Sequence, residues 1–404
     1  MFEFRRQPLK ALYILYTVIT VPSVRVPYWI ITSILPAWRP RKRWTLYRTL
    51  NVYALQAAVK FVFATGAFTG DAPEKSQRNA DKLGFVWVEP LPAELVRGDV
   101  TEAALVNDVS PAQVHGYWVG KGVGNGSHAR KAKSGEKVLY HFHGGGFVFG
   151  SSHPNDQHNC QVTALVKECS STFERAFSLD YRLSSAAPFV QANPFPAALL
   201  DTLSGYRYLV ETVGFQPHNI VVCGDSAGGQ LALSLTRYLI RESIPSLPPP
   251  GALVLVSPSV DWACTDLGNP SCSTRANASS DFLAPLFENG YIVRCLLGSL
   301  PYEEIHNNAW FSPASLRIST NGLFEKFPPT CIIAGGAEQL VDGIRVLRDR
   351  LIADNGKEKI VYWEYPDATH DFLMTTYHEP ERSEAQKGLA EWFDGVFECK
   401  TSSN

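Results

Sequence analysis

The 404-residue sequence lacks the cysteine patterns of a zinc site: it has no C-x-x-C pair and no group of histidines and cysteines at ligand spacing. It also lacks a basic or acidic block beyond the N-terminal region, and its net charge is only −2, so nothing indicates binding to nucleic acid. We therefore expect neither a metal nor another cofactor. The cysteines are scattered, at positions 160, 169, 223, 264, 272, 295, 331 and 399.

No internal repeat or low-complexity segment divides the chain, and 45% of its residues are hydrophobic. That is enough for one large α/β domain with an appendage. Strand patterns alternate with helix patterns along most of the chain, which predicts a mostly parallel central sheet flanked by helices. We expect strands near 84–88, 114–119, 138–142, 174–180, 219–223, 252–256, 330–334 and 359–364, and helices near 156–168, 196–212, 229–242, 342–353 and 383–397.

Gly-Asp-Ser-Ala-Gly at 224–228 is the most informative motif of the chain. An apolar run at 219–223 precedes it and a predicted helix follows, which is the strand–turn–helix context of a nucleophile elbow. Such an elbow holds its serine, here Ser226, in a strained turn with the hydroxyl clear of the backbone. Glycines in and beside the motif avoid collisions between a Cβ and the neighbouring strand and helix. The motif therefore predicts a serine nucleophile.

A second motif lies upstream, after the apolar strand predicted over 138–142. His143 is followed by three glycines, and consecutive glycines let backbone N–H groups point toward one place. We predict an oxyanion hole formed by the N–H groups of Gly144, Gly145 and Ala227. His143 is expected to hold the glycine loop by hydrogen bonding and not to carry a proton.

A serine hydroxyl needs an adjacent base to act as a nucleophile, and the base needs an orienting acid. Behind an elbow of this kind, the acid comes next in the chain and the histidine last. Glu338 follows a predicted strand at the position of the acid, and His370 follows the last predicted strand on a short loop. Asp342 stays open as an alternative acid. The predicted catalytic residues are Ser226, Glu338 and His370.

Four motifs in this order resemble the hormone-sensitive-lipase-like branch of the α/β-hydrolases. They are His-Gly-Gly-Gly-Phe at 143–147, Asp-Tyr-Arg-Leu at 180–183, Pro-Phe-Pro-Ala at 194–197 and Gly-Asp-Ser-Ala-Gly-Gly at 224–229. The resemblance covers about residues 80–400 and looks closest to fungal members, which include steryl acetyl hydrolases and esterases of secondary-metabolite pathways. It implies an α/β-hydrolase fold with a helical cap. Its acid is usually Asp, where this chain has Glu338.

Further residues are expected to support or line the site. Asp225, beside the nucleophile, is interpreted as a support of the elbow. Asp180 and Arg182 look like a framework ion pair or a loop brace, as they do in the family that the chain resembles. Phe147 is expected to line the acyl or alcohol pocket. Tyr181 either lines the same pocket or is a packed aromatic residue.

The alternation of strands and helices also divides the chain. Residues 1–75 are expected to form a membrane-associating or cap segment, and residues 76–404 the catalytic domain. The alternation breaks off over 262–315, where such hydrolases carry a lid insertion. Within this insertion, the apolar stretch at 282–297 predicts a helix.

The N-terminal segment has two uncharged apolar runs, at 11–24 and 26–38, each shorter than the ~20 residues of a spanning helix. Several prolines interrupt the pattern. Aromatic residues and the basic run at 39–43 suit a lipid–water interface. We favour membrane association through residues 8–44, as a kinked span or an interfacial hairpin, for example at the endoplasmic reticulum. The alternatives are a signal peptide and a cap on a cytoplasmic protein.

The motifs together predict a serine carboxylesterase that forms an acyl-serine intermediate, which water then hydrolyses. By resemblance, the substrate is a small hydrophobic ester with a short acyl group such as acetyl, formed from a sterol or a secondary metabolite. Two alternatives stay open. One is an acyltransferase or cyclisation catalyst that uses the same intermediate. The other is a non-catalytic ligand-binding protein on the same fold, which the presence of His370 disfavours. Oligomeric state is not predicted.

Overall fold

The computed structural model describes residues 2–66 and 72–401, with side chains described through residue 398. Its centre is an eight-stranded sheet with the strand order β1-β2-β4-β3-β5-β6-β7-β8. β1 pairs with β2, and β2 with β4, in antiparallel fashion, whereas β3 to β8 run parallel. The predicted mostly parallel sheet is confirmed. The strands are β1 (Phe85–Val88), β2 (Val114–Gly120), β3 (Lys137–Phe142), β4 (Phe173–Asp180), β5 (Ile220–Asp225), β6 (Ala252–Val256), β7 (Thr330–Gly335) and β8 (Ile360–Tyr365).

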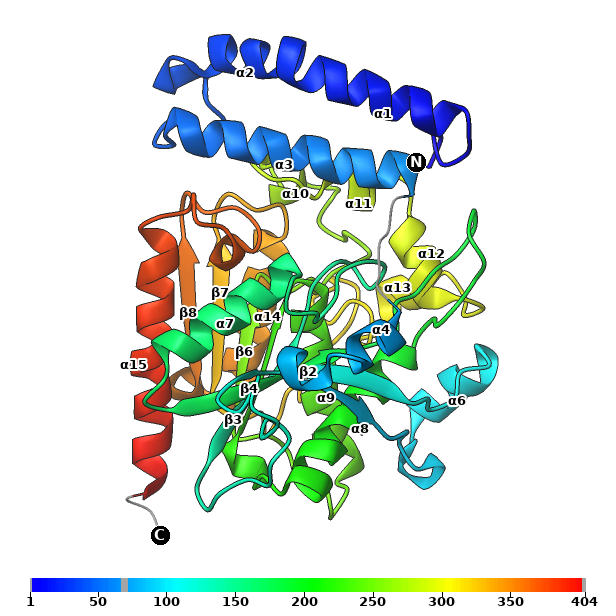
Figure 1. Ribbon diagram of the computed structural model, residues 1–404, viewed down its shortest axis with the longest axis vertical. Coiled ribbons are helices and arrows are strands. Elements are labelled where there is room, and N and C mark those ends of the chain that lie inside the picture. Colours follow the sequence, from blue (N-terminus) through cyan, green and yellow to red (C-terminus); the bar gives the residue numbers. More distant parts are fainter. Residues whose placement is uncertain (1, 67–71, 402–404) are drawn as a thin grey trace.

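Helices cover both faces of this sheet (Figure 1). In a strand, successive side chains point to opposite faces, and in β5 Val222 belongs to one buried cluster while Val221 and Cys223 belong to the other. Because both faces are covered, the central strands are mostly apolar. One face carries α7 (Gln157–Glu168) and α15 (Glu381–Thr401), and the other carries α8 (Ala197–Arg207), α9 (Ala227–Glu242) and α14 (Val341–Asn355).

The predicted lid region at 262–315 contains only short helices. The single helix predicted over 282–297 is wrong, because the stretch forms two helices. Gly290 lies between them with φ of 62°, a left-handed conformation that does not continue an α-helix. The helices of the region are α10 (Ser273–Ala276), α11 (Ala284–Phe287), α12 (Tyr291–Leu297) and α13 (Glu304–Asn307).

The N-terminal residues form a helical layer above the α/β domain (Figure 1). A continuous helix over Leu9–Ser33 is followed by a return helix, which lies between it and the α/β domain. Prolines were expected to interrupt the apolar pattern, but Pro22 and Pro27 lie within this helix. A π-helical turn at Val21–Arg25 widens the helix at Pro22 and so accommodates the ring. The elements are α1 (Leu9–Thr20), η1 (Val21–Arg25), α2 (Val26–Ser33), η2 (Pro36–Trp38) and α3 (Leu46–Thr65).

Polar contacts fix α3 and the turn before it to the α/β domain. Arg48 donates to both carboxylate oxygens of Glu381 at 2.7 Å, and the indole N–H of Trp44 donates to the Asp367 carbonyl at 2.7 Å. Gln56 donates to the Asp281 carbonyl at 2.8 Å, at the edge of the lid region. The lower helix of the N-terminal layer is therefore attached to the α/β domain.

Among the described residues between α3 and β2, the structure has three small α-helices. The domain boundary predicted between residues 75 and 76 falls within the first of them, after residues 67–71, which lie outside the described residues. The helices are α4 (Pro73–Gln77), α5 (Ala80–Leu83) and α6 (Asp99–Val106).

Candidate active site

Ser226 stands at the turn between β5 and α9. Its backbone has φ of 52° and ψ of −118°, a strained conformation for a residue with a side chain. The turn is tight because two glycines allow it. A Cβ on Gly224 would lie 2.2 Å from the Gly228 carbonyl oxygen, and one on Gly228 would lie 2.1 Å from that of Phe142. The strand–turn–helix geometry predicted for the nucleophile elbow is thus present.

Glu338 and His370 come together behind the ends of β7 and β8. Oε2 of Glu338 lies 2.8 Å from Nδ1 of His370, and Oε1 accepts the Gly335 N–H at 2.9 Å. Both side chains are buried. The carboxylate is therefore fixed by the backbone on one side and holds the imidazole on the other, which is the geometry of an orienting acid.

Asp342, the alternative acid, does not reach the imidazole. Its Oδ2 accepts the Ser273 N–H at 2.7 Å, and its Oδ1 accepts a hydrogen bond from Arg345 at 2.9 Å. Asp342 lies in the first turn of α14 and connects that helix to the lid region. These contacts favour Glu338 as the acid.

The other nitrogen of His370 faces a second carboxylate. Nε2 lies 3.1 Å from Oδ2 of Asp371, and no hydrogen bond joins it to Ser226 among the described residues. The serine hydroxyl lies 3.2 Å from Oγ of Ser259 instead. Burial alone would lower the pKa of His370, but the charges of Asp371 and Glu338 and their hydrogen bonds raise it well above 6.5.

The N–H groups predicted to form an oxyanion hole have different surroundings. The N–H of Gly144 donates to Oδ2 of Asp225 at 2.8 Å, so it is not free to bind an oxyanion, and its predicted role is wrong. Gly145 and Gly146 line the cavity at Ser226, and no described residue accepts a hydrogen bond from the N–H of either. Ala227, the third predicted donor site, is the first residue of α9, where backbone N–H groups have no partner within the helix.

Asp225 supports the glycine loop and the elbow together. Besides the Gly144 N–H, it accepts hydrogen bonds from Gln161 at 2.6 Å and contacts Nε2 of His141 at 3.0 Å. Burial would raise the pKa of its carboxyl group, but the hydrogen bond to His141 and the charge of His158 lower it. An ionised carboxylate thus holds the loop in place. His143 contacts the Gly144 carbonyl through Nδ1 at 2.8 Å, in line with the predicted structural role.

A cavity of about 600 Å³ opens at Ser226. Helix α3 contributes Leu55 and Val59 to its wall, so the N-terminal layer forms part of the site. Most of the wall is apolar, and the polar groups gather at the reacting residues. The lining residues are Leu55, Val59, Gly145, Gly146, Phe149, Gln157, His158, Ser226, Phe282, Leu283, Leu286, His370, Asp371, Met374 and Thr375.

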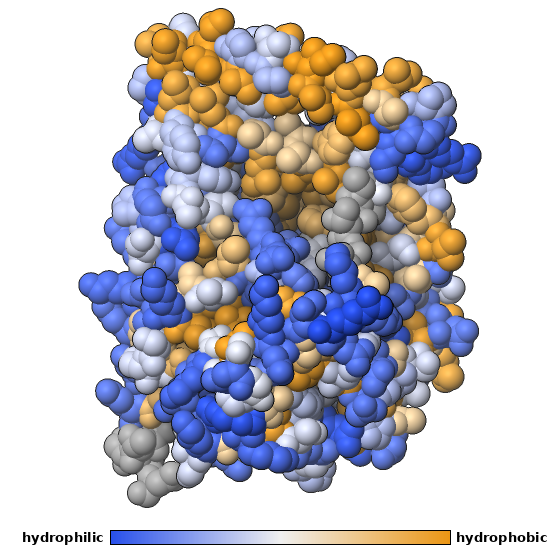
Figure 2. Space-filling model, in the orientation of Figure 1, coloured by the Kyte–Doolittle hydropathy of each residue, from blue (hydrophilic) through white to orange (hydrophobic). Residues whose placement is uncertain are grey.

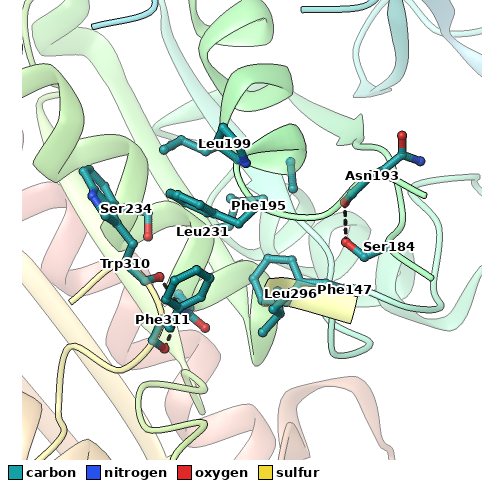
Figure 3. A pocket seen from close by; sticks show the side chains of 13 residues that line it. Phe147, Ser184, Asn193, Phe195, Leu199, Leu231, Ser234, Leu296, Trp310 and Phe311 are labelled. Atoms are coloured by element: carbon teal, nitrogen blue, oxygen red, sulfur yellow. Dashed lines mark hydrogen bonds between the residues drawn. The ribbon is translucent and has the colours of Figure 1, made fainter. Parts of the chain in front are cut away.

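The two predicted pocket residues lie elsewhere. Phe147 lines a second cavity, of about 380 Å³, with Leu199, Leu231 and Trp310 (Figure 3). Tyr181 lines neither of these two cavities, and its contacts favour the packed aromatic residue of the two alternatives. Its hydroxyl donates to the His143 carbonyl at 2.7 Å and its ring stacks on the imidazole of that histidine at 4.3 Å, which makes it the packed aromatic residue of the alternative.

The predicted ion pair between Asp180 and Arg182 is wrong, because the two residues have different partners. Arg182 pairs with buried Asp201 at 2.8 Å. Asp180 accepts the Ser152 N–H at 2.7 Å and lies 2.9 Å from Nε2 of His115. Strand β4 ends at Asp180. Arg182 lies beyond the strand, so its side chain need not point to the same side as that of Asp180. Both residues brace loops.

Sequence reasoning missed several residues of the site. Asp371 follows the predicted base directly, so an acid beside a histidine was the available signal. Gly146 is the third glycine of a recognised motif. No sequence signal could have identified Leu55 and Val59, because the apolar pattern of α3 does not indicate which part of the protein its apolar face packs against. Among residues 2–66 and 72–398, no group of His, Cys, Asp or Glu side chains is arranged to hold a metal ion.

Comparison with known proteins gives a family match. The profile of the alpha/beta hydrolase fold matches residues 139–374 of the chain. The chain is 27% identical to an esterase of Acinetobacter venetianus over 270 residues. This alignment covers 66% of this chain and 78% of that protein. It is 28% identical to an acetyl-hydrolase of Streptomyces hygroscopicus over 241 residues. This alignment covers 60% of this chain and 70% of that protein.

Solved structures share the fold. A hormone-sensitive lipase from a metagenome library has a TM-score of 0.52 at 25% identity. The superposition covers 81% of this chain and 100% of the lipase chain. An esterase/lipase from an uncultured bacterium has a TM-score of 0.55 at 22% identity, covering 85% of this chain and 98% of its own.

Proposed function

The chain belongs to the family of the alpha/beta hydrolase fold, and we propose that its residues hydrolyse an ester as follows. The protein is a carboxylic ester hydrolase, like the hormone-sensitive-lipase-like esterases with which it shares sequence and fold. The observation that carries the proposal is the contact of 2.8 Å between Glu338 and His370 behind a serine in a strained elbow. This combination is the usual arrangement of an acid, a base and a nucleophile.

In the proposed reaction, Oγ of Ser226 attacks the ester carbonyl while Nε2 of His370 accepts its proton. Glu338 holds the proton on Nδ1 and stabilises the imidazolium that forms. The N–H groups of Gly145, Gly146 and Ala227 bind the oxyanion. His370 then returns its proton to the leaving alcohol, and water hydrolyses the acyl-serine by the same steps.

We infer that the substrate is an ester of a hydrophobic alcohol, such as a sterol or a secondary metabolite, with a short acyl group such as acetyl. The apolar wall formed by Leu55, Val59 and Leu286 supports a hydrophobic substrate. A relative named acetyl-hydrolase supports a short acyl group. The motif resemblance to fungal steryl acetyl hydrolases points the same way.

We further propose that the N-terminal layer binds the lipid–water interface. The helix over Leu9–Ser33 has 25 residues and is long and apolar enough to cross a bilayer. Its outer side forms an apolar ridge, visible along the top of Figure 2. We define the N-terminal ridge as Leu12, Leu15, Val18, Ile19, Val24 and Ile31, all of which are more than half exposed.

The polar groups of this helix suit a lipid environment. The hydroxyls of Thr17, Thr20 and Thr32 each donate to the carbonyl four residues earlier, so they need no water as a partner. The helix stays on the enzyme through ring contacts with α3, such as Trp29 with Tyr53 at 5.7 Å. Because α3 is bonded to the α/β domain, we favour a helix that lies in the interface over one that crosses the bilayer.

Labelling with a fluorophosphonate, together with hydrolysis of nitrophenyl acetate and steryl acetates, tests the enzymatic proposal. The wild-type protein should be labelled and Ser226→Ala should not. The variant should lose ester turnover by ~10⁴-fold or more, because the covalent route disappears. Near-wild-type turnover in Ser226→Ala would exclude the mechanism. A Ser259→Ala variant is the matched control, since its hydroxyl lies next to that of Ser226, and it should remain labelled.

A further inference from the structure

His158 places a second imidazole in the wall of the cavity at Ser226, and the proposed mechanism does not use it. It is the second residue of α7, and its side chain is 13% exposed. Nδ1 lies 2.7 Å from Oδ1 of Asp156, the residue that caps α7, and the same oxygen accepts the backbone N–H of His158 at 2.9 Å. An ionised carboxylate oxygen only accepts hydrogen bonds, so Nδ1 carries a proton and the ring is held in one orientation.

The other nitrogen of this ring is available to a ligand. No described residue forms a hydrogen bond with Nε2 of His158, and this nitrogen is not sealed in the interior. The imidazole of His143, whose ring centre lies 5.8 Å away, differs in this respect, because its Nε2 is buried without a hydrogen-bond partner. Since His158 belongs to the lining of the cavity, a molecule in the cavity can reach its free nitrogen.

Nearby carboxylates keep the imidazole of His158 protonated. Burial alone would lower its pKa, whereas the hydrogen bond to Asp156 and the charge of that carboxylate raise it. The charges of Asp225 and Asp371 act in the same direction, and the pKa rises to about 9. The remaining titratable neighbour is His143, whose own pKa is lowered, chiefly by burial. At neutral pH both nitrogens of His158 therefore carry protons, and Nε2 is a charged hydrogen-bond donor.

The same charges indicate which kind of group Nε2 binds. The three carboxylates around the ring would repel a further anion. A neutral oxygen, such as that of a ketone, an ether or a hydroxyl group, accepts a charge-assisted hydrogen bond without adding negative charge. Because most of the wall is apolar, one such hydrogen bond would also fix the orientation of an apolar ligand.

We propose that Nε2 of His158 donates a hydrogen bond to a neutral oxygen of the substrate that lies outside the ester being cleaved. The enzyme therefore prefers esters of hydrophobic compounds that carry a second, uncharged oxygen over those that carry only the ester. The inference rests on the proposed function and narrows its substrate class. His158 binds substrate in this proposal and keeps its proton throughout the reaction.

Competitive inhibition by two rings of the same size tests the inference, because a ring can turn its oxygen toward any part of the wall. Cyclododecanone carries a neutral oxygen, and cyclododecane has none. Both are measured against hydrolysis of nitrophenyl butyrate by the full-length protein in detergent. The inhibition constant of cyclododecane divided by that of cyclododecanone should be about tenfold higher for the wild-type protein than for His158→Leu, which removes the donor. An equal ratio in the two proteins would overturn the inference.

This comparison isolates the side chain of His158. Hydrogen bonds of the ketone to the oxyanion-binding groups, and the partition of both rings into detergent, are common to the two proteins and cancel. Since both rings are measured on one preparation, a partial folding defect does not change the ratio. His153→Leu is the matched control, because His153 precedes the same helix but lies outside the cavity lining, and it should keep the wild-type ratio.

The pH dependence distinguishes a hydrogen bond from a change of shape. The wild-type ratio should fall as the pH is raised through about 9, because Nε2 loses its proton while Nδ1 keeps the one that it shares with Asp156. His158→Gln supplies an amide donor that does not titrate, so it should keep part of the preference and show no such fall. A wild-type ratio that stays constant with pH would contradict the role of Nε2 as a donor.

An anionic ring tests the nature of the ligand. If cyclododecanecarboxylate lost affinity in His158→Leu and cyclododecanone did not, the site would bind anions and the inference of a neutral oxygen would be wrong. Failure of the proposed function looks different: nitrophenyl butyrate would not be hydrolysed, and no fluorophosphonate labelling dependent on Ser226 would occur. In that case the inference would fall with it.

Discussion

Glu338 and His370 are 32 residues apart in the chain, yet Oε2 of the first lies 2.8 Å from Nδ1 of the second. The contact exists because β7 and β8 are parallel neighbours and the loops after their carboxyl ends meet at one edge of the sheet. Asp371 contacts the opposite nitrogen of the same imidazole at 3.1 Å. The histidine is therefore held between two carboxylates, and each carboxylate has a separate consequence that can be measured.

Glu338→Gln should lose far more activity than Asp342→Asn. The amide cannot hold the imidazole in the tautomer that the reaction needs, a defect that costs on the order of 10⁴ in kcat in serine proteases. Asp342 contacts Ser273 and Arg345 instead, so its loss should cost much less. Steady-state kinetics on nitrophenyl acetate measure both variants. The reverse ranking would show that Asp342 is the acid.

The acidic limb of the pH profile should respond to Asp371. His370 must be unprotonated to accept the serine proton, so kcat/KM rises as the pH passes upward through its pKa. The carboxylates around His370 are Glu338, Asp371 and Asp281, and the first two raise the pKa of the imidazole. In Asp371→Asn this pKa should fall, and the limb should move to lower pH by about one unit or more. A limb that moves upward or stays in place would contradict the assignment.

The carboxyl group of Asp371 adds a second feature to this profile. Burial raises the pKa of Asp371 to about 6, although the charge of His370 acts in the opposite direction. Below this pH the carboxyl group is increasingly protonated and no longer attracts the imidazolium. The acidic limb of the kcat/KM profile should therefore show a second inflection near pH 6.

Charges on the N-terminal ridge should release the protein from membranes. Leu12→Glu with Ile31→Glu puts carboxylates on a surface that we propose to lie among lipids, where a charge is costly. Flotation with phospholipid vesicles should recover the wild-type protein in the lipid fraction and leave the double variant behind. Leu105→Glu is the control, because Leu105 is 77% exposed on α6. If the double variant floats like the control, the ridge does not mediate binding.

A larger side chain on the lower helix should change the substrate size that the site accepts. Val59 lines the cavity at Ser226, so Val59→Trp should lower kcat/KM for steryl acetates at least tenfold while nitrophenyl acetate is hydrolysed at a similar rate. The expectation follows from lost space, since a cavity filled by one indole excludes a bulky alcohol. Ala58→Trp, one residue earlier and exposed, should have little effect. Equal effects of both variants on both esters would contradict a role of α3 in the cavity.

The sheet, the elbow and the catalytic candidates could be predicted from the amino-acid sequence alone. Strand and helix positions follow from local periodicity, and the strands at the centre of the sheet are mostly apolar. Ser226, Glu338 and His370 could be selected because their chemistry demands a fixed chain order behind recognisable strands. The glycines at 224 and 228 could be interpreted too, since the turn admits no Cβ there.

The partners of these residues could be identified only from the three-dimensional fold. Gly144 donates to Asp225 and not into the cavity, Arg182 pairs with Asp201 and not with Asp180, and Asp371 occupies the second nitrogen of His370. The packing of α3 over the site and the continuous helix through Pro22 also could not be predicted from local sequence. Hydrogen-bond partners and packing faces depend on distances between residues far apart in the chain, and local sequence carries no record of those distances.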